Sequence, residues 1–277
     1  ESISPEALRE LMPGLETGDL VAACYEPDSG YADPYLTVTS YAQAARRLGV
    51  TVLQEREVTG IRLVKHRVVG VETAEGPLDA PCVLNTAGSW GARVASLAGV
   101  GLPIHACRVQ VAFFRRPPGH EAEHPVVGDF VHASYFRPET GGLTLAGLID
   151  PAEAQAIVNP DHYAKKVDSE FVWDIGERLV RRYPALEDAE STGGYASLYG
   201  ITPDWHPVVD EVPPGSGFYV CAGFSGHGFK LGPAVGLMVA DLIEGVSEPR
   251  FDPHLFRYDR FAEGEPVRGQ YEYSIVG

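Results

Sequence analysis

One segment near the end of the chain constrains the fold more than any other: YVCAGFSGHGFKLGPAVGLMVADLI, residues 219–243. An apolar run typical of a buried strand ends at Gly223, a glycine-rich loop follows, and a helical pattern begins after Pro233. The glycines let the backbone approach a ligand closely, and the helix start offers free amide groups and the positive end of its dipole. The segment predicts a cradle for an anion or a cofactor. A tight strand-to-helix turn that binds nothing explains the same residues equally well.

The same order recurs upstream, where the apolar run CVLNTA (82–87) is followed by the turn and helical pattern GSWGARVASLAGV (88–100). Two strand–turn–helix segments of this kind predict a mixed α/β domain. Between about 102 and 182, strand-like pieces precede a helical stretch, which predicts a separate and mostly antiparallel sheet. Local patterns further predict a helix from about Pro5 to Met12 capped by Ser4, a helix ending at Gly49, and a strand at VTVLQ (50–54).

Composition excludes several classes of protein. With 277 residues and 44% hydrophobic residues the chain can bury a sizeable core, and its 38 acidic against 22 basic residues disfavour nucleic acid and anionic membranes as partners. We find no apolar run of the roughly 20 residues that span a bilayer and no signal-peptide pattern, so we expect no membrane insertion and a cytoplasmic location. The four cysteines form no CxxC pair, which favours isolated buried thiols over a metal site or disulfides.

The run HEAEH (120–124) matches a zinc-protease pattern that requires a helix to place both histidines on one face. It lies between PPG and Pro125, without an apolar helical pattern around it. We therefore expect a solvated loop and no metal site.

Several motifs in a fixed order carry a family resemblance. GFSGHGFK (223–230), with TPDWHPVV (202–209) upstream and RYDRF (257–261) after it, resembles the C-terminal signature of the D-amino-acid oxidase superfamily, in its glycine oxidase and sarcosine oxidase branch. AGSWGARVA (87–95) is similar to the strand-end turn of that family, and EREVTGI (55–61) to its strand beside the adenine. The resemblance implies FAD as cofactor and oxidation of the C–N bond of a small amino acid or N-methyl amino acid, by hydride transfer to the flavin.

The resemblance also implies roles for individual residues. Lys230 would bind the substrate carboxylate, because its compact ammonium charge suits a small carboxylate. Tyr199 would form one side of the substrate site. Asp204 and His206 are expected to pack the loop rather than act as acid and base. The residues implied to bind FAD are Val58, Gly88, Trp90, Gly223, Gly226, His227, Gly228, Phe229 and Lys230.

Three positions depart from the pattern of the sarcosine oxidases. Ser197 takes the place of the cysteine that tethers their flavin, so we expect FAD to be held noncovalently. Thr144 and Leu148 take the places of a lysine and a histidine of their active site. These departures make a dehydrogenase as reasonable as an oxidase.

The family's GxGxxG segment precedes the first residue of this sequence, and without it the pyrophosphate loses its main helix dipole and backbone amides. We therefore expect the chain alone to bind FAD poorly and to be inactive, and either a missing N-terminal segment or a second chain to complete the site. The expected fold is α+β: an incomplete Rossmann-like FAD domain from 29–101 and 195–277, and a substrate domain from 1–28 and 102–194.

Two alternatives stay open. One is a non-catalytic or partner-dependent subunit whose flavin site has decayed, against which the intact GFSGHGFK argues. The other is a member acting on a different substrate class, such as a glycerol-phosphate dehydrogenase, which would be expected to show more basic residues near its site.

Overall fold

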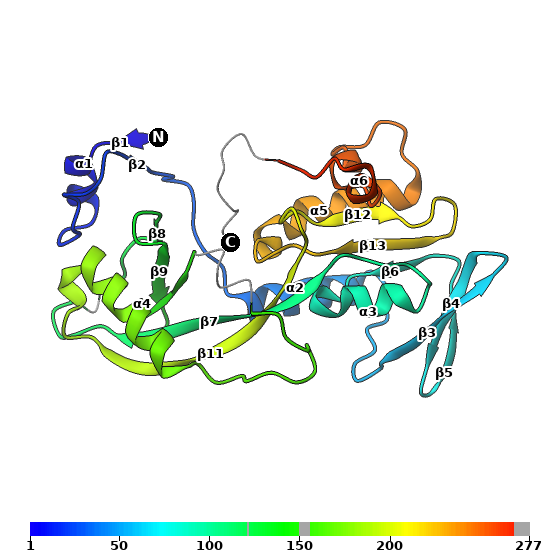
Figure 1. The fold of residues 1–277 in the computed structure, drawn as a ribbon, viewed down its shortest axis with the longest axis horizontal. Helices are drawn as coiled ribbons and strands as arrows, with labels where there is room; N and C mark the ends of the chain where they lie inside the picture. Colours follow the sequence, from blue (N-terminus) through cyan, green and yellow to red (C-terminus); the bar gives the residue numbers. More distant parts are fainter. Residues whose placement is uncertain (121, 150–155, 269–277) are drawn as a thin grey trace. The chain divides into compact units, whose positions relative to one another are not determined.

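The computed structural model describes residues 1–120, 122–149 and 156–268 (Figure 1). The chain forms two compact units. The first unit comprises 1–32, 108–156 and 163–197, and the second comprises 33–107, 157–162 and 198–277. Each unit combines helices with a β-sheet, so the predicted mixed α/β class is confirmed.

The first unit is built on a five-stranded sheet in the order β11-β7-β10-β9-β8. The pairs β7–β10, β10–β9 and β9–β8 are antiparallel, which confirms the mostly antiparallel sheet expected for this part. The elements of this unit are β1 (Ser2–Ile3), α1 (Pro5–Leu11), β2 (Ala23–Cys24), β7 (His105–Arg115), β8 (Val127–Asp129), β9 (Ser134–Glu139), β10 (Leu143–Leu148), α4 (Ser169–Arg182), η3 (Pro184–Leu186) and β11 (Glu190–Ile201). Residues 105–107 of β7 and 198–201 of β11 belong to the second unit.

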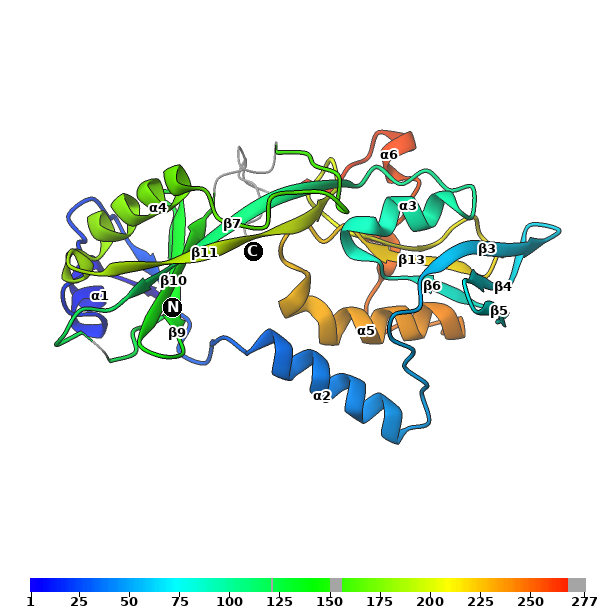
Figure 2. The ribbon, with the colours of Figure 1, turned by 90° about the horizontal axis from the view of Figure 1, so that it is seen from below.

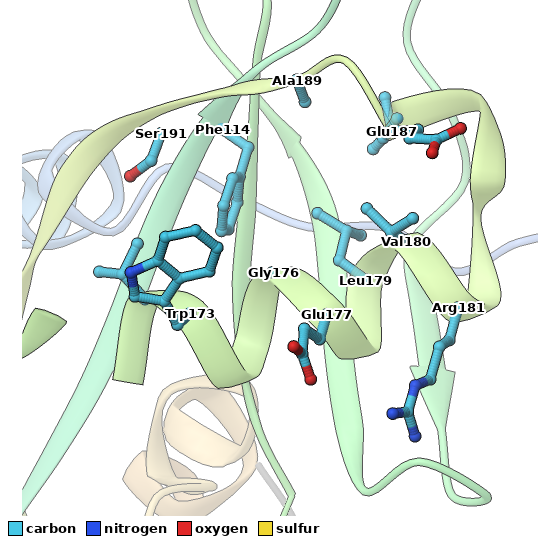
Figure 3. Close-up of a pocket in the computed structure, with 12 residues that line it drawn as sticks. Phe114, Trp173, Gly176, Glu177, Leu179, Val180, Arg181, Glu187, Ala189 and Ser191 are labelled. Atoms are coloured by element: carbon cyan, nitrogen blue, oxygen red, sulfur yellow. The ribbon is translucent and has the colours of Figure 1, made fainter. Parts of the chain in front are cut away.

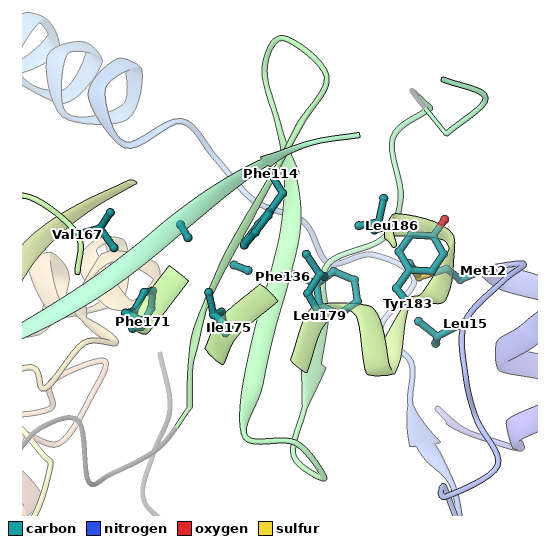
Figure 4. Close-up of a cluster of buried hydrophobic side chains, with 12 residues drawn as sticks. Met12, Leu15, Phe114, Phe136, Val167, Phe171, Ile175, Leu179, Tyr183 and Leu186 are labelled. Carbon is teal, nitrogen blue, oxygen red and sulfur yellow. The ribbon is translucent and has the colours of Figure 1, made fainter. Parts of the chain in front are cut away.

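Helix α4 covers one face of this sheet. Its buried residues Phe171, Ile175 and Leu179 recur every four positions, so one stripe of the helix faces inward. They pack with Phe136 of β9 and with Ala146 of β10 in one apolar cluster (Figure 4). The prediction of a helix starting at Pro5 is also confirmed, because the Ser4 side chain accepts a hydrogen bond from the Ala7 amide.

The second unit contains a three-stranded sheet in the order β12-β13-β6. β13 runs antiparallel to β12 and parallel to β6. Phe218, Val220 and Ala222 of β13 pack with α3, while Cys221 packs with Met238 of α5, so the two faces of the strand have different helical covers (Figure 2). The elements of this sandwich are β6 (Val83–Asn85), η1 (Gly88–Trp90), α3 (Gly91–Ser96), β12 (Val208–Glu211), β13 (Phe218–Ala222) and α5 (Gly228–Glu244).

The remaining elements of the second unit surround this sandwich. β3 (Val58–Val64), β4 (Arg67–Thr73) and β5 (Gly76–Asp79) form a small antiparallel sheet. Helix α2 (Pro34–Arg47) is the predicted helix before Gly49, and η4 (Pro253–Phe256) and α6 (Arg260–Glu263) follow α5.

Two local predictions were wrong. Residues 50–54 form no strand: they are exposed and pair with no other described strand, and β-propensity alone does not hold an extended segment without a partner. Helix α5 begins at Gly228, five residues before Pro233, because the positive-φ residues Gly223 and Gly226 complete the turn first. Proline is then accommodated inside the helix, at the cost of one backbone hydrogen bond.

Candidate functional site

The parallel strands β6 and β13 end at the same edge of the second unit's sheet, where ligands of α/β folds usually bind. Each strand leads into a glycine-containing turn and then a helix. Asn85, the last residue of β6, is buried and fixes its turn: its amide donates to the Gly91 carbonyl at 2.9 Å and its oxygen accepts from the Ala87 amide at 3.1 Å. Sequence analysis missed Asn85, although a polar residue closing a buried strand was a usable signal.

The loop that follows β13 is tightly packed and requires its glycines. Gly223 and Gly226 have φ values of +82° and +93°, which L side chains rarely adopt. A Cβ at Gly223 would lie 2.5 Å from the Thr202 methyl group, and a Cβ at Gly226 would lie 2.5 Å from the Tyr199 ring. The Tyr199 ring therefore lies directly against the loop.

The two turns converge on the end of β11. The Ser225 amide donates to the Gly200 carbonyl at 3.0 Å, and a Cβ at Gly200 would lie 3.2 Å from the carbonyl oxygen of Gly88. Gly88 itself has φ +53° and open space where a Cβ would stand. Five of the predicted residues, Tyr199, Gly88, Gly223, Gly226 and Gly228, thus belong to one group of loops within the second unit.

The start of α5 places a positively charged side chain beside the loop that follows β13. Lys230 lies in the first turn of the helix, is exposed, and forms no ion pair among the described residues. His227 occupies the N-cap position but its side chain caps no backbone amide. An uncapped helix start and an unpaired ammonium group both favour a bound anion. Phe229 beside them is 49% exposed.

His227 is buried and neutral in character. Burial lowers the pKa of its imidazole, an interaction with the Ser225 backbone opposes this, and the positive charge of Lys230 adds to the lowering. Its Nδ1 atom is buried without a hydrogen-bond partner among the described residues. An unpartnered buried ring nitrogen is costly, which marks this position as one where a bound group would be favourable.

Val58 and Trp90 lie near the turn that follows β6. Val58 opens β3 and lines a cavity of about 600 Å³ with Thr86 and Ala87, which follow β6, and Arg93 of α3. Trp90 is partly buried in the turn before α3. Val58 and the turn after β6 therefore border the same space.

Asp204 and His206 are structural, as expected. The Asp204 carboxylate forms a fully buried ion pair with Arg260 of α6, at 2.8 Å, and also accepts from the Val267 amide. Burial raises the pKa of Asp204, but these hydrogen bonds outweigh it and hold the pKa below its ordinary value. Arg260 was not singled out in the sequence, because nothing local links it to a residue 56 positions earlier.

In the run from His120 to His124, the described residues lie outside helices and strands, but they are not all solvated. His124 is buried, its Nε2 lies 2.9 Å from the Thr144 hydroxyl, and its ring contacts those of Phe136 and Tyr183 edge-on. Glu121 lies outside the described residues. Across the described ranges, no group of three or more metal-ligating side chains gathers.

The prediction that the cysteines are isolated and buried is correct for only part of the set. All four cysteines are free, as expected, but only Cys107 and Cys221 are buried, while Cys82 is partly exposed and Cys24 is exposed. In the part of the chain that the structure describes, no helix has the length and apolar character needed to cross a membrane.

Thr144 and Leu148, which take the places of active-site residues of sarcosine oxidases in the resemblance, lie on the same face of β10. Both point toward the helix-covered side of the first unit's sheet: Thr144 is fully buried against His124, and Leu148 packs on the cluster that contains Ala146. Because strand side chains alternate, the opposite face of β10 presents Leu145 and Gly147.

A further groove lies in the first unit, and none of the predicted site residues lines it. It has a volume of about 760 Å³ and lies between α4, with Trp173, Glu177 and Arg181, and the start of β11 near Ser191 (Figure 3). Its polar groups form no converging set. It is not a candidate for the cofactor site.

The residues at the strand ends fit a large cofactor such as FAD. The open space at Gly88, the unpartnered Nδ1 of His227 and the uncapped start of α5 are the features that such a group would satisfy.

Comparison with known proteins agrees with this geometry. Human mitochondrial sarcosine dehydrogenase is 31% identical over 276 residues, which cover 94% of this chain and 29% of that protein. The bovine FAD-dependent oxidoreductase domain-containing protein 1 is 28% identical, with 96% of this chain and 60% of that protein covered. The chain therefore spans less than two thirds of the length of these relatives.

Solved structures show the same fold. L-proline dehydrogenase from P. horikoshii superposes with a TM-score of 0.87 and 27% identity, over 96% of this chain and 70% of that one. Glycine oxidase from Geobacillus kaustophilus gives a TM-score of 0.78 and 26% identity, over 94% and 66%. The family model for FAD dependent oxidoreductases matches residues 1–242. This chain therefore belongs to the DAO family of FAD-dependent oxidoreductases.

Proposed function

We propose that the protein oxidises the C–N bond of a small amino acid or N-methyl amino acid, and that Lys230 binds the substrate carboxylate. The observation that carries this proposal is the unpaired Lys230 in the first turn of α5, next to the glycine loop on which Tyr199 packs. FAD, when bound, would supply the hydride acceptor.

The chain's own residues then bind and orient the substrate. An ammonium group beside free helix amides holds a small carboxylate at a fixed point, since both attract negative charge. The Tyr199 ring cannot move toward the loop, because it already lies against Gly226, so it forms a rigid wall. Orientation of this kind is the protein's main contribution when a cofactor performs the chemistry.

The assignment of the two units is part of the proposal. The second unit carries all the predicted cofactor residues, and the first unit carries the antiparallel sheet that we assign to substrate binding. β6 pairs with β13 alone among the described strands, which leaves one side of it free for a strand from outside this chain. We propose that a segment N-terminal to this chain, or a second chain, supplies both that strand and the amides that bind the pyrophosphate. We further propose that FAD is held noncovalently, since Ser197 stands where a tethering cysteine would be. The proposed location of the protein is the cytoplasm.

The first experiment is the visible spectrum of the full-length gene product, followed by anaerobic addition of glycine, sarcosine, proline and D-amino acids. Flavin bands that bleach with one of these would support the proposal and identify the substrate. The rate at which colour returns in air separates an oxidase from a dehydrogenase. A colourless protein that takes up no added FAD would instead favour a non-catalytic subunit.

Lys230→Met tests the carboxylate contact in the same protein. Because a hydrogen bond to a charged group contributes about 1.5–3 kcal/mol, we expect substrate affinity to fall by roughly 10- to 100-fold, and FAD affinity to fall far less. Lys165→Met, which removes an exposed lysine of the first unit, is the matched control and should alter neither affinity. An equal loss of substrate and FAD binding in Lys230→Met would contradict the assignment.

A further inference from the structure

We propose that Asp161 is a positioning residue for the cofactor site, because its carboxylate holds the side chain of Trp90 and thereby the turn that follows β6. This inference rests on the proposed function, in which the turn from Gly88 to Trp90 borders the cofactor. No motif of the sequence pointed to Asp161.

One carboxylate connects two side chains of a single short turn. Asp161 Oδ1 accepts a hydrogen bond from the indole Nε1 of Trp90 at 2.7 Å, and its Oδ2 accepts one from the guanidinium of Arg93. Trp90 and Arg93 are three positions apart, so their side chains leave the same side of the helix start. The indole N–H is a donor only, which makes a fixed acceptor its natural partner.

The acceptor is itself held in place. The Asp161 amide donates to the Asn159 side chain at 2.9 Å, and the amide of Val158 donates to the Ala106 carbonyl at the start of β7, also at 2.9 Å. Residues 157–162 and the turn belong to the same compact unit. Asp161 is thus anchored through its backbone, unlike a surface carboxylate on a mobile loop.

Asn85 holds the backbone on either side of the turn, and Asp161 holds the side chains of Trp90 and Arg93 that leave it. η1 is a three-residue 3-10 helix without a side-chain cap, and Gly88 at its start is in the left-handed region with open space beside it. Short 3-10 turns have poor hydrogen-bond geometry and are weak on their own. Both hydrogen bonds, first that from Trp90 and then that from Arg93, lower the pKa of Asp161, because both donors favour the charged carboxylate.

An ordinary exposed ion pair contributes little to stability, and the Arg93 contact alone would be such a pair. The contact with Trp90 differs because it orients a large planar side chain at the edge of the proposed site. The consequence expected for Asp161 is therefore an effect on ligand binding rather than on folding.

The test uses the full-length gene product and the variants Asp161→Ala, Asp161→Asn, Trp90→Phe and Trp90→Phe/Asp161→Ala. We expect Asp161→Ala to weaken FAD binding by about tenfold, which corresponds to about 1.4 kcal/mol, and Asp161→Asn to weaken it less because the amide oxygen still accepts from the indole. The double variant should bind FAD no worse than the weaker of its two parents, since both changes remove the same contact. Asp174→Ala, which breaks an exposed pair with Arg178 in the first unit, is the control for a lost surface carboxylate.

Tryptophan fluorescence gives a readout that does not depend on FAD. In the full-length gene product with every tryptophan except Trp90 replaced by Phe, Trp173 and Trp205 of this chain included, Asp161→Ala should shift the emission of Trp90 to the red and increase its quenching by acrylamide. The thermal midpoint of the apo-protein should change no more in Asp161→Ala than in Asp174→Ala.

The outcomes separate this inference from the function on which it rests. A wild-type protein that binds FAD, with an Asp161→Ala variant that binds it equally well or more tightly, would overturn the positioning role alone. Additive losses in the double variant would also overturn it, because they would mean that Asp161 does not act through Trp90. A wild-type protein that takes up no FAD would overturn the proposed function, and with it any cofactor role for Asp161.

Discussion

Substitution of Gly226 by alanine should damage the loop after β13 through two separable effects. The residue has φ +93°, and an L side chain in the left-handed region costs roughly 1–2 kcal/mol. The new Cβ would also lie 2.5, 2.8 and 2.9 Å from three atoms of the Tyr199 ring, so the ring or the loop must move, and overpacking of this kind costs typically about 1–3 kcal/mol. We expect a total loss of about 2–5 kcal/mol of unfolding free energy and a weaker site for FAD.

Two controls divide this loss into its parts, with urea unfolding and FAD titration of the full-length protein as the assays. Gly215→Ala places a side chain at φ +76° with nothing within 4 Å, so it should show the backbone cost alone. In a Tyr199→Ala background, Gly226→Ala should cost only as much as Gly215→Ala does. If Gly226→Ala in the wild-type background is no more destabilising than Gly215→Ala, the close contact between Tyr199 and the loop is wrong.

Three further predictions concern the rest of the molecule. Phe136→Ala should lower the unfolding free energy by about 3–5 kcal/mol in denaturant titrations, since its side chain is 1% exposed within the core of the first unit. Asp204→Asn should flatten the acid limb of a curve of unfolding free energy against pH. The depressed pKa of Asp204 in the folded protein adds stability above the ordinary aspartate pKa of about 3.9, and this stability is lost as the pH falls through the folded pKa. An acid limb that is unchanged in the variant would refute this prediction. Alkylation followed by mass spectrometry should modify exposed Cys24 first and spare Cys221, whose pKa is raised by burial to about 11; equal rates would contradict the structure.

Local patterns in the sequence were sufficient for most elements and for the family. Helix α4 follows from apolar residues at helical spacing, and the Ser4 cap from a motif contained within a few residues. The glycines of the loop after β13 were also predictable, because only glycine tolerates the backbone that such a turn needs. The assignments of Lys230 and Tyr199 came from motifs in order along the chain, and stay predictions until substrate binding is measured.

Other features were decided by tertiary contacts. VTVLQ has the composition of a strand, yet it stays irregular because no described strand lies beside it. The burial of Thr144 was decided by which face of its sheet α4 covers, because neighbouring residues of a strand face opposite sides.

What the sequence by itself determined is therefore the family, the mixed α/β class and the glycine loop, since each depends on residues close together in the chain. Only the tertiary structure revealed that Asp161 holds Trp90 and that Arg260 neutralises Asp204, contacts that join residues 71 and 56 positions apart. Such partners are chosen by where the backbone places them, and no periodicity or local propensity encodes that choice.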